Sequence, residues 1–225
     1  SDLKNAKNKD PVQRQQEKGM ESEEWSPMNP PDAYDIPSEV ETVPYEEMPT
    51  ILKELSDEHQ TLLNKLEEVE GALKGFKENN WVLGEEGNET LKSFFSLVDE
   101  TLFPHQRKEE KALFPIMKER LITHGEHSRA QIGTDTRTAI DILEDDHLKI
   151  IQLNGLIFNL LGMASRLPNP ESQTLLLDAT YEQARSMTET LKLHIHREDN
   201  TIFPLACQLI NEEEFQQIEA QKEYC

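Results

Sequence analysis

Six histidine and glutamate residues recur in the sequence at spacings that suit metal binding. Each half of the chain has one histidine, followed at a distance by a His-x-x-x-Glu pair. The residues are His59, His105, Glu109, His147, His194 and Glu198. Side chains four residues apart on a helix differ by about 40° around the axis and about 6 Å along it. Each His-x-x-x-Glu pair therefore directs two ligands toward one place.

Burial of six ionisable side chains is costly unless something compensates each of them. Divalent cations supply that compensation, and a mixed set of nitrogen and oxygen ligands suits iron, manganese or zinc. Two ferrous ions carry an excess of positive charge over Glu109 and Glu198, which favours an anionic bridge such as hydroxide. With both carboxylates bridging the ions, at least one position stays open for a diatomic ligand.

The two halves of the chain repeat the whole arrangement. A lone histidine on an apolar stripe is more often a core residue, and a lone His-x-x-x-Glu is more often a surface pair. Here the first histidine precedes the second by 46 residues in one half and by 47 in the other. An apolar residue and then Phe-Pro follow each glutamate, at 113–115 and 202–204. This recurrence favours a metal site built from two helical hairpins with pseudo-twofold symmetry.

Apolar residues three or four apart predict four amphipathic helices. The first runs for about 25 residues from Pro49 to near Gly75. The second contains Pro104, which should kink it or leave one backbone hydrogen bond open. The third and fourth helices place Phe158 and Leu205, respectively, on their buried stripes.

Further signals complete the expected fold. A polar link at residues 122–135 joins the hairpins and carries His124 and His127, whose role the sequence does not reveal. A short fifth helix is expected where Asn211 and Glu214 form a capping-box pattern. These elements predict an all-α fold: an up-down four-helix bundle of two repeated helical hairpins, with a short C-terminal helix.

Residues 1–48 differ in composition from the rest of the chain. They contain repeated prolines and little apolar periodicity, which predicts an extended or disordered leader. The helical bundle is expected to occupy residues 49–225. A few apolar anchors, among them Trp25 and Tyr34, would let the leader lie along the bundle surface.

The chain is strongly acidic, with a net charge of −21 at pH 7. Such a charge repels nucleic acid and anionic membrane surfaces, so neither is an expected partner. The sequence shows no long apolar run for a bilayer and no secretion signal at its start. Cys207 and Cys225 are too few for a disulfide framework, which fits a reducing compartment. We therefore expect a cytoplasmic protein.

Two motifs resemble those of the hemerythrin-like, or HHE cation-binding, family, and the resemblance covers about residues 50–210. The motifs are His105-Gln-Arg-Lys-Glu109-Glu110 through Leu113-Phe114-Pro115, and the copy that ends in Phe203-Pro204. The resemblance implies two non-haem iron ions with an oxo or hydroxo bridge, held by the six residues above. It also implies reactivity toward O2, peroxide or NO.

The chain departs from relatives within that family. Invertebrate oxygen carriers have a further histidine where this chain has Ile151, and they take a carboxylate ligand at the position of Asp199. The missing histidine makes the site more symmetric and closer to bacterial hemerythrin-like proteins and iron-sulphur repair proteins. The N-terminal cysteine motif common in the repair proteins does not occur in this sequence.

Three functions are compatible with this resemblance. We prefer a binding protein that holds or senses O2 or NO, because no separate general acid, nucleophile or cofactor motif indicates an enzyme. The alternative is a di-iron enzyme that reduces peroxide or NO or repairs iron-sulphur centres, with an unidentified redox partner. Metal storage or buffering is a further alternative, although two ions per chain is a low capacity. A ferritin-like site fits less well because it requires a carboxylate on all four helices.

Acidic residues adjoin the proposed ligands. Glu110 and Asp199 follow the two glutamates and rotate about 100° away, so we expect them to be solvated or to support a ligand. Glu58 and Asp146 precede two of the histidines. They could orient an imidazole, but solvation is the expected outcome.

Overall fold

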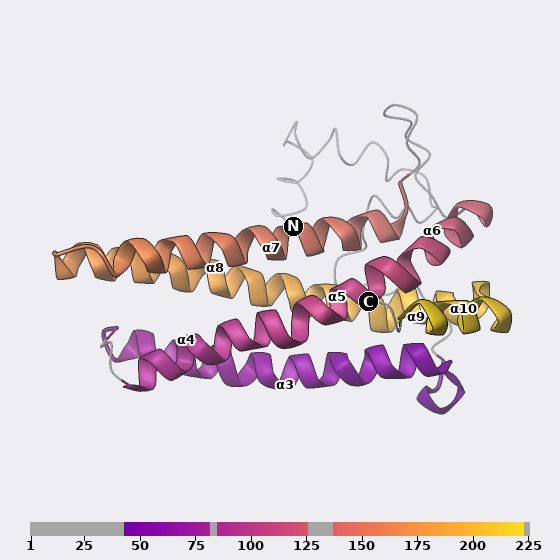
Figure 1. Cartoon of the computed structure of the whole chain (residues 1–225), viewed down its shortest axis with the longest axis horizontal. Coiled ribbons are helices and arrows are strands. Elements are labelled where there is room, and N and C mark those ends of the chain that lie inside the picture. The colour runs from indigo at the N-terminus through magenta and orange to yellow at the C-terminus, as the bar shows by residue number, and fades with distance from the viewer. Residues whose placement is uncertain (1–42, 82–84, 126–136, 223–225) are drawn as a thin grey trace, which may run out of the picture.

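The computed structural model describes residues 43–81, 85–125 and 137–222, and the statements below concern these residues. It confirms an all-α helical bundle (Figure 1). The elements are η1 (Tyr45–Glu47), α3 (Thr50–Glu78), α4 (Glu85–Leu97), η2 (Val98–Leu102), α5 (Phe103–Lys108), η3 (Glu109–Leu113), α6 (Phe114–Thr123), α7 (Ala139–Ala164), α8 (Pro170–Arg197), η4 (Glu198–Ile202), α9 (Phe203–Leu209) and α10 (Glu212–Lys222).

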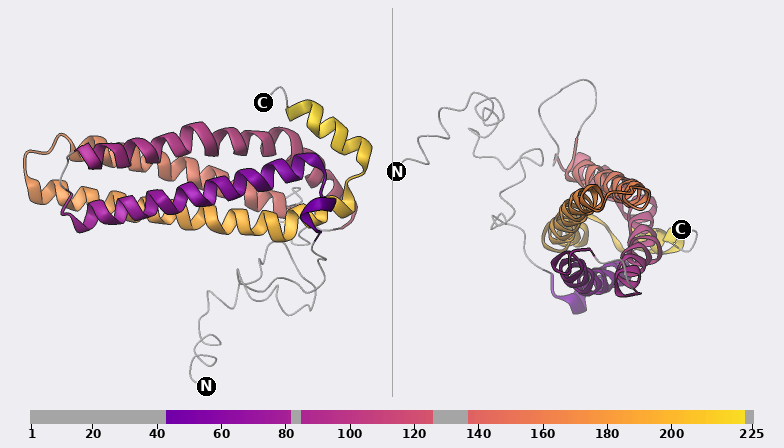
Figure 2. Two further views of the ribbon diagram at one scale, coloured as in Figure 1. Left: turned by 90° about the horizontal axis from the view of Figure 1, so that it is seen from below. Right: turned by 90° about the vertical axis from the view of Figure 1, so that its left-hand side faces the viewer.

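Long helical rods run side by side around a common axis, as the end-on view in Figure 2 shows. The rods are α3, the continuous run from α4 to α6, α7, and the run from α8 to α9. The first two rods form one hairpin and the last two form the other, as predicted, and α10 is the expected C-terminal helix. The predicted leader lies mostly outside the described residues, so the proposed division into leader and bundle stays a prediction.

A five-residue π-helical turn precedes each of three Phe-Pro dipeptides. These turns are η2, η3 and η4, and in each the phenylalanine N–H donates to the carbonyl five residues earlier. Proline has no N–H, so the carbonyl four residues before it loses its helical partner, and the wider turn accommodates this loss. The disturbance expected at Pro104 is therefore confirmed as a local π turn within a helix that continues beyond it.

The spacing of buried residues shows what these turns do. The main line of buried positions in the second rod is 98, 102, 105, 109, 113, 117 and 121. It spans 23 residues in six steps, about 3.8 residues per turn, which exceeds the 3.6 of an α-helix. In the fourth rod the expected core residue Leu205 is half-buried and packs against the edge of the core, whereas Ala206 is fully buried. The prediction is confirmed only in part, because η4 shifts the phase of the helix.

Two further expectations were wrong in detail. Helix α3 ends at Glu78 rather than near Gly75, because Phe76 extends the buried stripe and packs against Trp81 with ring centroids 5.1 Å apart. Phe158 was expected in the core but is 65 % exposed. It follows the buried Ile157 and is rotated about 100° from it.

Two capping boxes fix where helices begin. The expected box before α10 is confirmed: Asn211 N–H donates to Glu214 at 3.0 Å, and Glu214 N–H donates to the Asn211 side chain at 3.0 Å. A second box begins α7, where Thr138 N–H donates to Asp141 at 2.7 Å. Asp141 also accepts from Lys118 of α6 at 2.6 Å, so it joins the two hairpins.

Replacing Asp141 by asparagine should lower the free energy of unfolding by about 1–2 kcal/mol. Burial raises the pKa of Asp141, but the hydrogen bonds from Lys118 and Thr138 outweigh burial and hold that pKa below its usual value. Its contribution is therefore present at neutral pH and is lost as the pH falls through the lowered pKa. Urea denaturation measures the effect, with the exposed Asp99→Asn as control. Equal losses in both variants would contradict this role.

No helix in the described part of the chain is long and apolar enough to cross a bilayer.

Candidate metal centre

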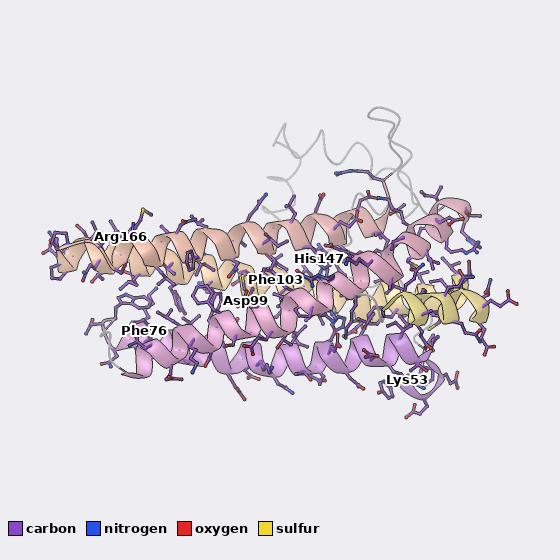
Figure 3. The ribbon with its side chains drawn as sticks, in the orientation of Figure 1. Lys53, Phe76, Asp99, Phe103, His147 and Arg166 are labelled. Atoms are coloured by element: carbon purple, nitrogen blue, oxygen red, sulfur yellow. The ribbon has the colours of Figure 1, made fainter. Side chains whose placement is uncertain are left out.

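Four histidines, one from each rod, meet in the interior of the bundle. They are His59 of α3, His105 of α5, His147 of α7 and His194 of α8. All are at most 2 % exposed. The Nε2 atoms of His59 and His105 lie 3.0 Å apart, and those of His147 and His194 also lie 3.0 Å apart. Figure 3 labels His147 where α7 faces the other helices.

Glu109, the first residue of η3, lies between the two histidine pairs. Its Oε1 is 3.0 Å from Nε2 of His105 and 3.7 Å from Nε2 of His59. Its Oε2 is 3.4 Å from Nε2 of His147. The two oxygens of one carboxylate therefore face different pairs.

Glu198, the first residue of η4, takes the matching place in the second hairpin. Its Oε2 is 3.1 Å from Nε2 of His59 and 3.2 Å from Nε2 of His194. The donor atoms then form two groups, each compact enough to surround one ion. The groups are His59, His105, Glu109 and Glu198, and Glu109, His147 and His194.

The environment of the two glutamates fits a bound cation. Both side chains are 0 % exposed. None of their four carboxylate oxygens has a hydrogen-bond partner of acceptable geometry within the described part of the chain. A buried carboxylate without such partners is costly, and a divalent cation removes that cost. Imidazole nitrogens combined with carboxylate oxygens form a donor set that suits iron.

Two of the imidazoles each contact a carboxylate that belongs to the opposite hairpin. His59 Nδ1 lies 2.8 Å from Asp199, and His147 Nδ1 lies 2.8 Å from Glu110. A carboxylate that accepts the Nδ1 proton leaves Nε2 free as a donor and fixes the orientation of the ring. We expected Glu110 and Asp199 either to be solvated or to support a ligand. The structure shows the second outcome, because each carboxylate contacts an imidazole.

Solvation was the wrong expectation for Glu58 and Asp146. Glu58 is 27 % exposed, lies 2.8 Å from Nδ1 of His105 and forms an ion pair with Lys108. Asp146 is 16 % exposed and forms an ion pair with Arg197. Both face the next rod of their own hairpin, which the position of these residues on a single helix does not reveal.

The phenylalanines of the repeated Phe-Pro motifs pack on the same two imidazoles. Phe203 stacks on His59 with centroids 5.4 Å apart, and Phe114 stacks on His147 with centroids 5.5 Å apart. Each ring comes from the opposite hairpin. The motif therefore serves two purposes: its proline shapes the π turn, and its phenylalanine covers an imidazole and excludes water.

The pseudo-twofold symmetry fails at His194. Its Nδ1 is 3.8 Å from Asp146 and lacks a hydrogen-bond partner in the described part of the chain. Asp146 instead accepts from Arg197 at 2.7 Å. The corresponding Lys108 binds Glu58 without separating it from its histidine. The two donor groups therefore differ in how strongly their imidazoles are polarised.

Comparison with known proteins agrees with this geometry. The sequence profile of the hemerythrin HHE cation binding domain matches residues 50–206, well over half of the chain. The chain belongs to the hemerythrin HHE cation-binding family. Membership of this family implies non-haem iron binding, and the buried histidines and glutamates can hold a metal.

One curated relative of this hemerythrin-like chain is the iron-sulfur cluster repair protein YtfE of Cronobacter sakazakii. It is 28 % identical over 116 residues, which are 52 % of this chain and 46 % of the relative. The chain thus spans about half the length of that protein. A comparison with solved structures finds no significant match.

Protons compete with cations for the donors of this hemerythrin-like site. Burial lowers the pKa of His59, but the nearby carboxylates outweigh burial and raise it to about 12. The same balance raises the pKa of His105 to about 9 and that of His194 to about 10. Burial raises the pKa of Glu109, yet the neighbouring imidazoles hold it well below its usual value.

Several other residues lie away from the site. His124 is exposed and bonds to the backbone carbonyl of Arg120 at 2.9 Å, whereas His127 lies outside the described residues. Ile151, at the position of the additional histidine in oxygen carriers, is 48 % exposed on the outer side of α7. Burial raises the pKa of the half-buried Cys207 thiol.

Proposed function

We propose that this hemerythrin-like chain binds two iron ions and binds or senses O2 or NO at an open position on that centre. The proposed ligands are the six residues of the sequence prediction: His59, His105, Glu109, His147, His194 and Glu198. The observation that carries the proposal is the pair of buried carboxylates: each lies close to an imidazole of both histidine pairs, and neither has a hydrogen-bond partner of acceptable geometry among the described residues. When bound, the iron supplies affinity for diatomic ligands and one-electron chemistry.

The chain's own residues hold the donors and exclude water. Asp199 and Glu110 lie at the Nδ1 atoms of His59 and His147, so each carboxylate orients its ring with Nε2 toward the interior, where Nε2 would hold the metal once its proton is displaced. The stacked phenylalanines keep water from the same imidazoles. A dry and rigid set of ligands favours reversible binding over turnover, because protons are not delivered readily to the reacting centre.

Titrations of separate samples of the reduced, iron-loaded protein, prepared anaerobically, one with NO and one with O2, test this proposal. We expect two irons per chain, a saturable change in the absorption spectrum with each gas, and recovery of the initial spectrum when the gas is removed. Continuous consumption of the gas without a saturable spectral change would contradict a binding role. A protein that retains no iron after desalting would contradict the metal centre itself.

Repair of iron-sulphur centres is the second candidate function, and the name of the YtfE relative favours it. A repair protein must release its iron to an acceptor. Rapid transfer of iron from the loaded protein to a ferrous chelator would support this candidate. Retention of iron under the same conditions would support the binding role.

A further inference from the structure

In the first hairpin, one carboxylate bonds to an imidazole and to a cation at the same time. Oε2 of Glu58 lies 2.8 Å from Nδ1 of His105, and Oε1 accepts a hydrogen bond from Lys108. Lys108 also donates to Glu54 at 3.1 Å, so a second carboxylate shares its charge. Glu58 therefore has one oxygen for each partner, and the imidazole keeps its own acceptor.

In the second hairpin, the equivalent carboxylate bonds to the cation and leaves the imidazole without an acceptor. Asp146 occupies the position of Glu58 in the repeat, and Arg197 occupies that of Lys108. Oδ2 of Asp146 lies 2.7 Å from Arg197 but 3.8 Å from Nδ1 of His194. That nitrogen is buried and has no hydrogen-bond partner in the part of the chain that the structure describes.

Three differences between the halves of the repeat explain why Asp146 bonds to Arg197 alone. Aspartate is one methylene group shorter than glutamate, so its two oxygens reach less far. Ile142 occupies the position of Glu54, so no second carboxylate stands there to share the charge of the arginine. A guanidinium also offers five N–H donors in a planar fork, which holds a carboxylate more firmly than an ammonium group does.

The missing acceptor matters for an imidazole that holds a metal. When Nε2 is a ligand, the proton of the neutral ring is on Nδ1, and a buried N–H without an acceptor is costly. Loss of the group that orients a ligating imidazole weakens metal binding by about 10- to 100-fold. We propose that Arg197, by holding Asp146, makes the ion at His147 and His194 the weaker and more exchangeable of the two. This inference rests on the proposed di-iron function.

The rest of the centre has the same bias. Each of the other three histidines has a carboxylate oxygen 2.8 Å from its Nδ1. Both imidazoles of the first donor group, His59 and His105, are therefore oriented by an acceptor, whereas the second group has this support at His147 but not at His194. The first group also brings four donors close together and the second brings three. Arg197 is thus a positioning residue that acts on the second ion through Asp146.

Lengthening Asp146 to glutamate tests the proposal without a change in charge. The longer side chain can place one oxygen on Arg197 and the other on Nδ1 of His194, as Glu58 does in the first hairpin. We expect Asp146→Glu to tighten the weaker of the two stepwise dissociation constants for ferrous iron by about tenfold. Arg197→Gln should tighten the same constant, because it frees Asp146 to turn to His194. Anaerobic competition of the full-length protein with a ferrous chelator at fixed pH measures both constants.

Two further variants serve as controls. Glu58→Asp shortens the matching carboxylate of the first hairpin, so it should weaken the tighter constant by about tenfold. Lys192→Gln is matched to Arg197→Gln, because it also removes a cation of α8 that pairs with another rod, at 2.6 Å from Glu70. It should leave both constants unchanged. Repulsion between two cations separates the constants even in a symmetric centre, so the variants decide the question.

The imidazole protons give a readout that does not depend on affinity. Zinc is diamagnetic and accepts the same nitrogen and oxygen donors. In the zinc-loaded protein with nitrogen-15-labelled histidine, we expect the Nδ1–H signal of His194 to exchange with water faster than those of His59, His105 and His147. Asp146→Glu should slow this exchange and move the signal downfield, as a new hydrogen bond requires.

The possible outcomes separate this inference from the proposed function. Two bound irons with constants that neither Asp146→Glu nor Arg197→Gln tightens would overturn the inference and leave the di-iron proposal intact. A weaker constant that becomes weaker still in Arg197→Gln would show that the ion pair supports the second ion, and would also overturn the inference. A chain that binds no iron would overturn both.

Discussion

Replacing Glu109 by glutamine should reduce the bound iron from two ions per chain to at most one and weaken the remaining site by about a hundredfold or more. Oε1 of Glu109 faces His105 and its Oε2 faces His147, so this carboxylate belongs to both donor groups. An amide keeps the shape but removes the charge and one of the two acceptor oxygens. The loss therefore affects both ions rather than one.

Metal analysis after anaerobic reconstitution and desalting measures this effect, and circular dichroism checks that the variant remains helical. Glu119→Gln is the matched control, because Glu119 is an exposed glutamate in α6 of the same rod. It should retain two irons. If the Glu109→Gln protein also retained two irons with unchanged affinity, Glu109 would not be a shared ligand.

The positions of the six donors were predictable from the sequence because they depend on helix geometry and on repetition. The His-x-x-x-Glu spacing sets two side chains on one face, and the matching spacing in the other half indicates a second hairpin. The structure brings all six residues together in the bundle interior. Their role as ligands stays a prediction until iron is measured in the protein.

The residues that support the imidazoles were harder to predict. Asp199 and Glu110 point about 100° away from the neighbouring ligands, which places them toward a different helix. Whether that direction meets water or His59 depends on which rod is adjacent, and a single helix pattern contains no such information. In the structure, the opposite hairpin occupies that position.

The π turns are visible in the spacing of the buried residues, but an analysis that assumes 3.6 residues per turn throughout does not detect them. Buried positions four residues apart recur so often in the second rod that an ideal α-helix would rotate them off the face. Phe-Pro dipeptides mark where the extra residue is absorbed. Leu205 lies at the edge of the core and not at its centre because η4 departs from 3.6 residues per turn. The exposed Phe158 has a different origin, since neither the buried stripe nor the repeat requires an apolar residue there.

Iron affinity should rise steeply with pH. The pKa is raised to about 9 for His105 and to about 10 for His194. Both rings therefore carry a second proton, and a positive charge, at neutral pH when no metal is bound. A ligating imidazole must be neutral, so iron displaces these protons and its affinity increases about tenfold per pH unit for each proton released. The stability of the metal-free protein depends on pH in the opposite direction: it falls as the pH rises. These cations stabilise the fold fully below the unfolded pKa of 6.5, and that stability is lost as the pH rises through about 9 to about 10.

Calorimetric titration with ferrous iron in two buffers of different ionisation enthalpy counts the displaced protons. We expect at least two per chain near neutral pH, and fewer in Asp199→Asn, because Asp199 helps to raise the pKa of His59. The exposed Asp99→Asn should leave the count unchanged. Iron binding without proton release would mean that the imidazoles are already neutral. The buried carboxylates would then have no compensating charge except the metal, and the metal-free protein should be markedly less stable than the loaded form at every pH.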